Sequence, residues 1–212
     1  MSRKIRIVLI DDHEVVRAGF KMLIATNDLF EVVGEASRGE FAMQLYEQLK
    51  PDIIIMDLSM PGIGGLESIH RITNRYDQAL ILVFSIYNKE IYVTRALAAG
   101  AKGYITKNSA PELIFEAILR LVSGAIYVEA GLIDSNNEDQ PLVDYQLIVS
   151  ELSEREFDVF RLLVQGFSIE KISKDLCLAT KTVSNYITHL KKKLHAGSLI
   201  ELVKIAEILG VV

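Results

Sequence analysis

The chain has 212 residues, half of them hydrophobic, and its formal net charge at pH 7 is −5. Its apolar runs are all far shorter than the roughly 20 residues that a membrane-spanning helix needs, and its first residues lack the apolar region of a secretory signal. A single cysteine, Cys177, rules out an intramolecular disulfide and a cysteine-based metal cluster. We therefore expect a cytoplasmic protein of one large or two ordinary domains, with no membrane partner.

The charges are distributed unevenly along the chain. Residues 1–149 carry fourteen lysines and arginines against twenty acidic residues, a balance of −6, whereas residues 150–212 carry nine against eight, a balance of +1. The second part also contains the basic run Lys191-Lys192-Lys193. The acidic total does not indicate a nucleic-acid binder, but it hides this local basic run.

Short apolar runs alternate with longer amphipathic stretches over the first 123 residues. Most runs are β-branched and continuous, which is typical of strands buried on both faces of a parallel sheet. The runs are Ile5–Ile10, Val32-Val33, Ile53–Met56, Leu80–Phe84 and Tyr104-Ile105. Helix-like stretches separate them near residues 14–25, 39–49, 65–74, 89–99 and 110–123. Five successive βα units predict a doubly wound α/β domain with a five-stranded parallel sheet over residues 1–123.

Residues 124–149 show no clear period and contain the polar, turn-rich stretch 135–141, which is typical of a linker. Residues 150–212 show only helix-like stretches, near 153–165, 168–175, 180–194 and 198–209. The first of these begins with Ser153 and carries Glu156 three residues later, the pattern of a capping box. The chain is therefore predicted to end in a small all-α domain.

Charged and hydroxyl side chains follow four of the predicted strands. The first strand leads into Asp11 and Asp12, the third into Asp57, the fourth into Ser85 and the fifth into Lys107. Because the carboxyl ends of parallel strands meet at one edge of the sheet, we expect these side chains to converge. Three carboxylates together need a cation, and oxygen ligands suit Mg²⁺ or Mn²⁺. Such a site would suit a phosphoryl group that a carboxylate attacks while the metal and the lysine offset its charge.

Each of these residues has an ordinary interpretation when it is taken alone. An aspartate after a strand is usually a turn or cap residue, and a serine or lysine there is usually solvated. Their occurrence at the ends of four different strands is much harder to explain in this way, so the set as a whole indicates a functional site.

Residues 5–123 resemble the receiver domain of response regulators. The resemblance rests on Ser85 and on the segments 7–13 (IVLIDDH), 57–62 (DLSMPG) and 103–107 (GYITK). It implies that Asp57 is the phosphoacceptor and that Ser85 and Lys107 hold the phosphoryl oxygens. It also implies that the protein is not an enzyme acting on a separate substrate, but that it accepts a phosphoryl group and slowly hydrolyses its own aspartyl phosphate.

The same resemblance implies a site for Mg²⁺ or Mn²⁺. Asp12 and Asp57 would bind the ion directly, Asp11 would support it, and the backbone carbonyl of Ser59 would complete the protein ligands. Tyr104 resembles the aromatic side chain that swings inward when the serine hydroxyl moves. Without the family, a half-buried aromatic of an edge strand is an equally good interpretation of Tyr104.

Two residues depart from the usual receiver pattern. Asn108 follows the lysine where many receivers have a cis proline, so a trans peptide bond is expected. Ile86 stands where many receivers have a small residue, and its bulk could cover the phosphoryl site and slow the access of phosphodonor or water. His13, beside the acidic pair, is expected to cap the following helix rather than to bind metal.

The stretch 180–194 has the pattern of an amphipathic helix. Its apolar residues are spaced by four, three and four and form one stripe. Its opposite face carries short polar side chains near the helix start, which suit a major groove, and lysines further along, which suit phosphates. The candidate DNA contacts are Lys181, Thr182, Ser184, Asn185, Thr188, Lys191 and Lys192. Alone this pattern indicates an ordinary surface helix, and the neighbouring helices with short turns are what favour DNA binding.

Residues 150–212 resemble the LuxR-type helix-turn-helix, and the whole chain is therefore similar to the NarL/FixJ class of response regulators. The matching segments are 152–156 (LSERE), 165–168 (QGFS) and 180–186 (TKTVSNY). Within the class the chain looks closest to the GacA/UvrY branch, on segments 16–19 and 60–67. Ala179 stands where many relatives have a serine as N-cap, a change that costs about 0.5–2 kcal/mol unless Thr180 substitutes.

The implied partners are a histidine kinase, double-stranded DNA and a second copy of the chain. The candidate dimerisation residues lie on one stripe of the last helix: Leu199, Leu202, Val203 and Ala206. Two alternatives remain open at this point. One is a phosphorylation-independent DNA binder with a degenerate receiver. The other is a phosphatase with an aspartate nucleophile, although such enzymes of the haloacid-dehalogenase kind expect a second aspartate where Ser59 stands.

Overall fold

The computed structural model describes residues 3–133 and 145–212. The chain forms two compact units, one made of Met1–Asn88 and Tyr92–Leu132 and the other of Lys89–Ile91 and Ile133–Val212. The predicted linker, residues 124–149, lies partly outside the described residues, and its described parts contain a short strand and a short helix. None of the described helices combines the length and the apolar composition that crossing a bilayer requires.

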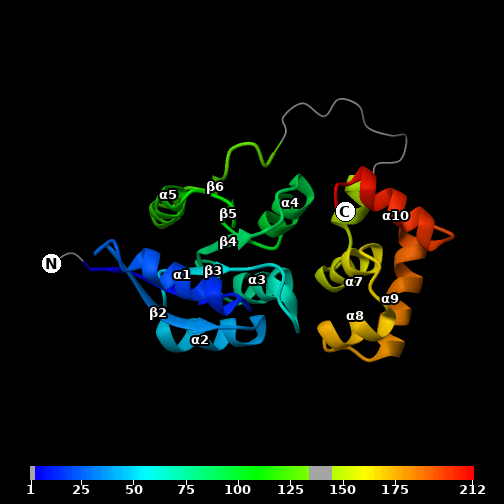
Figure 1. The fold of residues 1–212 in the computed structure, drawn as a ribbon, viewed down its shortest axis with the longest axis horizontal. Helices are drawn as coiled ribbons and strands as arrows, with labels where there is room; N and C mark the ends of the chain where they lie inside the picture. Colours follow the sequence, from blue (N-terminus) through cyan, green and yellow to red (C-terminus); the bar gives the residue numbers. More distant parts are fainter. Residues whose placement is uncertain (1–2, 134–144) are drawn as a thin grey trace. The chain divides into compact units, whose positions relative to one another are not determined.

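The first unit is built on a parallel sheet in the order β2-β1-β3-β4-β5-β6 (Figure 1). The strands are β1 Ile5–Ile10, β2 Phe30–Ala36, β3 Ile53–Met56, β4 Ile81–Ser85, β5 Gly103–Thr106 and β6 Tyr127–Val128. All five pairings between neighbours are parallel. The chain order reverses direction between β1 and β3, and sheets of this kind place their sites at the carboxyl ends of the strands there.

The sixth strand corrects the predicted count of five. β6 has only two residues, which is too short to show a strand period in the sequence. It follows a turn in which Gly124 has a φ of 88°, a conformation that glycine adopts without steric cost. The amide of Tyr127 donates to the carbonyl of Lys102, and the strand runs parallel to β5.

Helices cover the sheet of the first unit. They are α1 Glu14–Ile24, a 3₁₀ turn η1 Gly39–Phe41, α2 Ala42–Leu49, α3 Gly64–Arg75, α4 Glu90–Ala98 and α5 Pro111–Val122. One core cluster joins Phe20 and Ile24 of α1 and Ile118 of α5 to alternate strand residues such as Ile7 and Ile55. The intervening strand residues are buried as well. Burial on both sides explains why these strands read as continuous apolar runs.

The second unit contains only helices among its described residues. They are α6 Tyr145–Ser150, α7 Glu154–Val164, α8 Ile169–Asp175, α9 Thr180–Lys193 and α10 Leu199–Ile208 (Figure 1). The predicted capping box is confirmed, because the Ser153 hydroxyl accepts from the Glu156 amide and the Glu156 carboxylate accepts from the Ser153 amide. The α7, α8 and α9 helices pack against one another, and α10 packs against α7.

Candidate functional site

Strand pairing brings the predicted acidic residues to one edge of the sheet. Ile10 at the end of β1 pairs with Met56 at the end of β3, so that the next residues, Asp11 and Asp57, lie side by side. The amide of Asp57 donates to the carbonyl of Ile10 at 2.8 Å. On the other side, the amide of Lys107 donates to the carbonyl of Ser85, also at 2.8 Å. The predicted convergence of these strand ends is therefore present.

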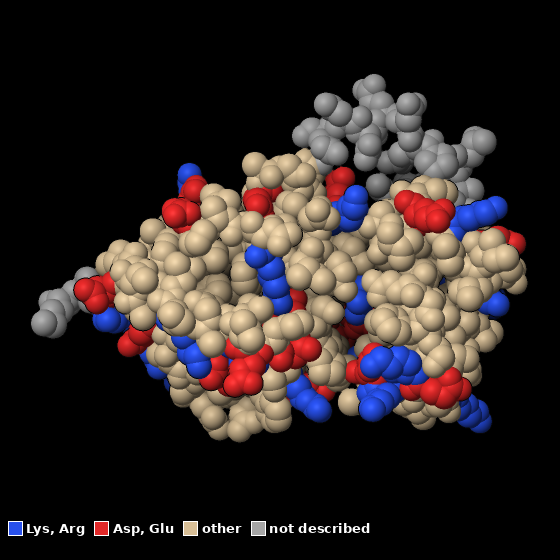
Figure 2. Space-filling view, viewed as in Figure 1, with Lys and Arg blue, Asp and Glu red and all other residues tan. Residues whose placement is uncertain are grey.

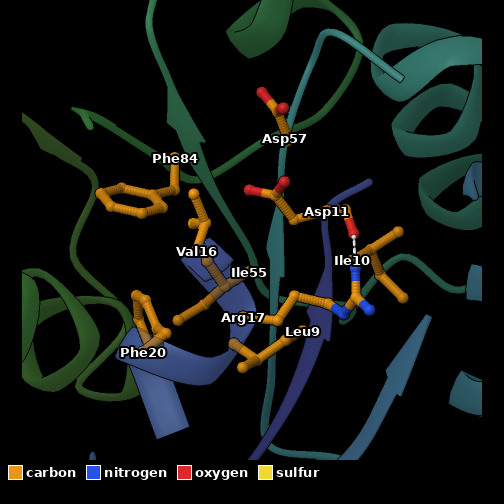
Figure 3. A pocket seen from close by; sticks show the side chains of 9 residues that line it. All are labelled: Leu9, Ile10, Asp11, Val16, Arg17, Phe20, Ile55, Asp57 and Phe84. Carbon is orange, nitrogen blue, oxygen red and sulfur yellow. Dashed lines mark hydrogen bonds between the residues drawn. The ribbon is translucent and has the colours of Figure 1, made fainter. Parts of the chain in front are cut away.

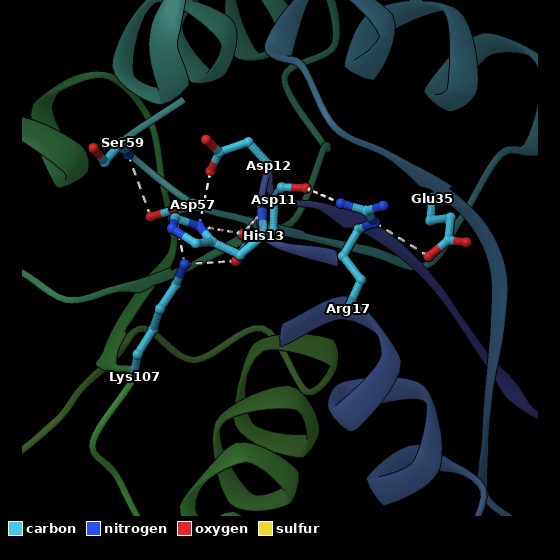
Figure 4. A network of polar contacts seen from close by, with 8 residues as sticks. All are labelled: Asp11, Asp12, His13, Arg17, Glu35, Asp57, Ser59 and Lys107. Atoms are coloured by element: carbon cyan, nitrogen blue, oxygen red, sulfur yellow. Dashed lines mark hydrogen bonds and ion pairs between the residues drawn. The ribbon is translucent and has the colours of Figure 1, made fainter. Parts of the chain in front are cut away.

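The Lys107 side chain bridges two carboxylates at this edge of the sheet (Figure 4). Its Nζ lies 2.8 Å from Oδ2 of Asp57 and 2.6 Å from Oδ2 of Asp11. Burial raises the pKa of the Asp57 carboxyl above its usual range, and the Lys107 ammonium offsets part of that rise. Burial alone would lower the pKa of Lys107, but the charges of Asp57 and Asp11 outweigh it and the pKa is raised.

The surroundings of Asp57 explain why burial has this effect. The pocket below the carboxylate is lined mainly by apolar side chains: Leu9, Ile10, Val16, Phe20, Ile55 and Phe84 (Figure 3). Arg17 is the cation of this pocket, and its guanidinium donates to the backbone carbonyl of Asp11 at 2.7 Å. Low polarity disfavours a charged carboxylate and strengthens the electrostatic interaction with Lys107.

His13 does not have the capping role that the sequence suggested. It occupies the N-cap position of α1, but its side chain makes no capping hydrogen bond. Its Nδ1 instead lies 3.1 Å from Oδ1 of Asp11 and 2.9 Å from Oδ1 of Asp12. One ligand atom from each of Asp11, Asp12, His13 and Asp57 can be chosen so that all four lie within 4.8 Å of one another. Adjacency to two acidic residues was the signal that could have indicated this contact.

A glycine in the first turn of α3 allows this helix to approach Asp57 closely. A Cβ atom at Gly65 would lie 2.1 Å from the carbonyl oxygen of Asp57 and 2.6 Å from the Cα of Leu58. The amide of Gly65 donates to the carbonyl of Leu58. The loop that carries Asp57 therefore depends on the absence of a side chain at this position.

Ser59 is hydrogen-bonded to Asp57, and Tyr104 to Ser85. The amide of Ser59 donates to Oδ1 of Asp57 at 3.3 Å. Ser85 is fully buried at the end of β4, and its hydroxyl accepts from the amide of Tyr87 at 3.4 Å.

The expected trans bond after Lys107 agrees with the backbone, because no peptide bond in the described part of the chain is cis. Ile86, expected as a possible cover, has 59% of its surface exposed.

Tyr104 is fully buried rather than half-buried. Its hydroxyl donates to the carbonyl of Tyr87 at 2.8 Å, and the Tyr87 ring stacks on that of Tyr92 with centroids 4.2 Å apart. Burial raises the pKa of Tyr104, and a hydrogen bond with Ser85 offsets part of the rise. The side chain is thus directed inward, toward Ser85 at the end of β4.

The amphipathic pattern of α9 is present in the structure. Val183, Leu190 and Leu194 are buried, whereas Ile187 is half-buried. Of the candidate DNA contacts, Lys181, Ser184, Asn185, Thr188 and Lys192 are exposed, and Thr182 and Lys191 are half-buried. Basic and acidic side chains are interspersed on the face drawn in Figure 2, so no field of one sign covers it.

Two hydroxyls on this helix are bonded to their own backbone. Ser184 donates to the carbonyl of Thr180 at 3.1 Å, and Thr188 donates to that of Ser184 at 3.0 Å. Ala179 is the N-cap of α9 and supplies no side-chain capping bond, as its chemistry requires. To contact a DNA base, the Ser184 or Thr188 hydroxyl would have to break its hydrogen bond to the backbone carbonyl or accept a hydrogen bond from the base through its oxygen.

The candidate dimerisation residues on α10 are not equally accessible. Leu199 is 45% exposed and Val203 is half-buried, but Leu202 and Ala206 have no exposed surface. These two residues are therefore wrong as direct contacts in this conformation, because α10 uses its inner side to pack against α7. Ile200, which the sequence prediction did not include, is 70% exposed.

Two protein families match this chain. The response regulator receiver domain matches residues 7–119, and the luxR family of bacterial regulatory proteins matches residues 150–206. Among solved structures, the RcsB response regulator of Salmonella typhimurium has a similar fold, with a TM-score of 0.71 and 23% identity, over 98% of this chain and 99% of that one.

Several relatives match over nearly the whole chain. The transcriptional regulatory protein YdfI of Bacillus subtilis (strain 168) is 34% identical over 202 residues, which cover 95% of this chain and 94% of that protein. The response regulator GacA of Pseudomonas aeruginosa is 32% identical over 210 residues, 95% of each chain. The nitrate/nitrite response regulator NarL of Escherichia coli (strain K12) is 35% identical over 199 residues, 92% of this chain and 91% of that one.

These similar identities support the class as a whole and do not single out the GacA/UvrY branch. The receiver family alone covers more than half of the chain, and the luxR family covers most of the second unit. The chain therefore belongs to the NarL/FixJ class of two-component response regulators, which are transcription regulators that join a receiver domain to a LuxR-type DNA-binding domain.

Proposed function

We propose that this response regulator accepts a phosphoryl group on Asp57 and thereby changes the affinity of its C-terminal domain for DNA. The observation that carries the proposal is the Lys107 ammonium, which lies within 3 Å of both Asp57 and Asp11 in a buried pocket. A phosphoryl group on Asp57 would bring its own oxygens to this ammonium, which could then bind them. The donor would be a phosphohistidine of a partner histidine kinase.

The transfer is a displacement at phosphorus. A carboxylate oxygen of Asp57 forms the new bond to phosphorus while the bond from phosphorus to the imidazole nitrogen breaks, and that nitrogen keeps the electron pair. The apolar surroundings raise the pKa of Asp57, which means that its carboxylate is more basic. Lys107 acts in the opposite direction and favours the ionised form that attacks. Slow attack of water on the aspartyl phosphate would return the protein to its initial state, and no separate substrate is turned over.

The acidic cluster fits a divalent cation such as Mg²⁺ or Mn²⁺. Oδ1 of Asp12 is buried without a hydrogen-bond partner among the described residues, although the His13 nitrogen lies 2.9 Å away, a contact that is an ion pair only with a protonated imidazole. We assign Asp12, Asp57 and the carbonyl of Ser59 as ligands, with Asp11 in support. When bound, the ion supplies positive charge to the phosphoryl oxygens.

Ser85 and Tyr104 are assigned to the step that reports phosphorylation. The Ser85 hydroxyl would turn from its present partner toward a phosphoryl oxygen. Tyr104 is already buried next to Ser85. The movement of the Ser85 hydroxyl would leave space and hydrogen-bonding groups there, and these would keep the Tyr104 side chain in its buried position. The buried tyrosine would then favour one of two arrangements of the surrounding surface, a shift of an existing equilibrium.

We assign DNA recognition to α9 and expect a dimer on the DNA. The polar face from Lys181 to Lys192 is accessible, with short side chains at the helix start for base edges and lysines for phosphates. RcsB has been solved bound to a promoter in the presence of a phosphomimetic, and as two dimers on two parallel DNAs. A regulator of this kind would act in the cytoplasm, where a kinase and the DNA are both accessible.

Intact-mass measurement after incubation with acetyl phosphate and Mg²⁺ tests the proposal. The wild-type chain should gain roughly 80 Da, the mass of one phosphoryl group, and Asp57→Asn should gain nothing. Asp77→Asn, which changes an exposed aspartate of the same domain, is the matched control and should label like the wild type. Undiminished labelling of Asp57→Asn would sink the assignment, and an unlabelled wild type would favour a phosphorylation-independent regulator.

A further inference from the structure

A carboxylate that follows the last strand holds the loop that carries Lys107. Oε2 of Glu129 accepts from the amide of Thr106 at 2.8 Å and from the hydroxyl of Ser109 at 2.7 Å. The amide of Glu129 donates to the carbonyl of Tyr104 at 3.0 Å. Glu129, the residue after β6, is thus hydrogen-bonded to Thr106, which precedes Lys107 in the sequence, and to Ser109, which follows it.

The contact continues the β5–β6 ladder with a side chain. Gly103 pairs with Tyr127, and Tyr104 pairs with Val128. Beyond these pairs, the Thr106 amide donates to the Glu129 carboxylate instead of to a backbone carbonyl. The Ser109 hydroxyl also lies 3.1 Å from that amide and 3.0 Å from the Thr106 hydroxyl, so the loop closes on itself around the carboxylate. Hydrogen bonds to a charged acceptor are stronger than neutral ones.

The same loop is tied to the phosphoryl pocket. The Lys107 amide is bonded to Ser85, and its ammonium contacts Asp57 and Asp11. A phosphoryl group on Asp57 changes the partners of both Lys107 and Ser85. Any resulting displacement of this short loop must either break the bonds to Glu129 or move Glu129 with it, because Thr106 directly precedes Lys107 and Ser109 lies two residues after it.

We propose that Glu129 is a positioning residue that couples the phosphorylation site to the segment leading toward the DNA-binding domain. The first unit ends only three residues later, at Leu132. The inference rests on the proposed function, since it requires phosphorylation at Asp57. It adds a second route of communication, through the β5–α5 loop, that does not use the Tyr104 side chain.

Amide exchange measured by NMR on the full-length protein can test the coupling, with beryllofluoride and Mg²⁺ as the mimic of the phosphoryl group. Glu129→Ala should speed the exchange of the Thr106 amide about tenfold, the scale expected when a hydrogen bond to a charged group is lost. It should still take up beryllofluoride, but residues 129–133 should no longer respond to it as they do in the wild type. Glu129→Gln keeps an acceptor of the same shape and should restore part of the response, which a purely structural loss of the side chain would not predict.

Glu112→Ala removes an exposed carboxylate from the first turn of α5 and is the matched control. An equal response of residues 129–133 in the wild type and Glu129→Ala would overturn the inference, as would a wild type that binds the mimic without any response there. If Glu129→Ala does not fold, the comparison of Glu129→Gln with the wild type decides in the same way. A wild type that neither binds beryllofluoride nor labels with acetyl phosphate would instead contradict the proposed function.

Discussion

The side-chain nitrogen of Lys107 lies 2.8 Å from Oδ2 of Asp57, although fifty positions separate the two residues in the chain. The contact exists because β3, β4 and β5 are neighbours in a parallel sheet and end at the same edge. A change that shifts one strand end relative to another would therefore act on the chemistry of the pocket as well as on the stability of the fold.

The role of the acidic cluster in metal binding can be tested with Asp12→Ala. This variant should lose the Mg²⁺ binding heat in isothermal titration and the metal-dependent labelling by acetyl phosphate. It should keep the fold, because removing one of several clustered carboxylates relieves repulsion in the absence of the ion. Asp77→Ala, which removes an exposed carboxylate, should bind Mg²⁺ like the wild type. Equal labelling of the wild type in EDTA would show that the metal assignment is wrong.

The close approach of α3 to Asp57 predicts a strong effect of Gly65→Ala. The added Cβ would lie 2.1 Å from the Asp57 carbonyl oxygen, so the loop must move. We expect the free energy of unfolding to fall by about 1–3 kcal/mol, as in overpacked cores, and the labelling rate of Asp57 to fall with it. Gly19→Ala is the control, because nothing lies within 4 Å of a Cβ there and alanine favours the helix. Urea denaturation and intact-mass kinetics would measure both quantities, and equal labelling rates would contradict the prediction.

Most of the fold was predictable because its periodicities are strong. Continuous apolar strands and amphipathic helices separated by short loops predicted the parallel sheet, and the strand ends predicted the meeting of Asp11, Asp57 and Lys107. β6 was missed because two residues carry no period and their pairing is a tertiary property. For the same reason Glu129 was missed, since a carboxylate in a predicted linker gives no sign that its hydrogen-bond donors lie at the end of β5 and in the loop after it.

The errors on α10 and at His13 have a different cause. A stripe such as that of Leu199, Leu202 and Ala206 shows which side of a helix is apolar, but not how much of it the domain itself covers. Likewise, the N-cap position of His13 was predictable from the helix start, whereas the direction of its side chain depends on the carboxylates beside it. In both cases the local sequence pattern was read correctly, but it did not contain the residues that the side chains contact in the folded chain.

The two types of DNA contact proposed for α9 should respond differently to salt. Lys192→Ala should lower the affinity for all sequences and reduce the slope of log K against log salt by about 0.9, the value for one phosphate contact. Asn185→Ala should leave the slope unchanged and alter which bases are preferred at one position. Fluorescence anisotropy at several salt concentrations would separate the two. A Lys192→Ala protein with the wild-type slope would contradict the phosphate assignment.

The capping box of α7 predicts a pH-dependent stability of the second unit. Oε2 of Glu156 accepts from the Ser153 amide at 2.8 Å and lies 2.8 Å from Nζ of Lys193. Burial would raise the pKa of Glu156, but the bonds from Lys193 and Ser153 outweigh it and hold the pKa below the usual 4.5. The folded state therefore favours the ionised carboxylate.

A carboxyl with a lowered pKa contributes stability that is complete above its unfolded value and is lost as the pH falls through its folded value. Glu156→Gln should therefore be less stable than the wild type at neutral pH, by about 1 kcal/mol for a weakened cap. The difference should shrink below about pH 4.5. Amide exchange of α7 in the full-length chain would measure it, with Glu151→Gln as the charge-matched control. A difference that stays constant with pH would contradict the role of the ionised carboxylate.

The last prediction concerns the dimer on DNA. One copy of this small, nearly neutral domain offers few phosphate contacts, so two copies on a two-fold site are needed for tight specific binding. Two accessible apolar residues at the start of α10, Leu199 and Ile200, are the contacts now proposed for this pairing, with Val203 beside them. The probe would be an inverted-repeat duplex, selected from random DNA with the phosphorylated protein, with half-sites about one helical turn apart.

Leu199→Asp should bind a single half-site like the wild type but lose roughly a hundredfold in affinity for the full repeat, because the avidity of paired binding is gone. Val15→Asp, which changes an exposed valine of the receiver, should retain that avidity. If native mass spectrometry finds one wild-type copy on the full repeat, or if Leu199→Asp binds the repeat as tightly as the wild type does, α10 is not the dimer contact.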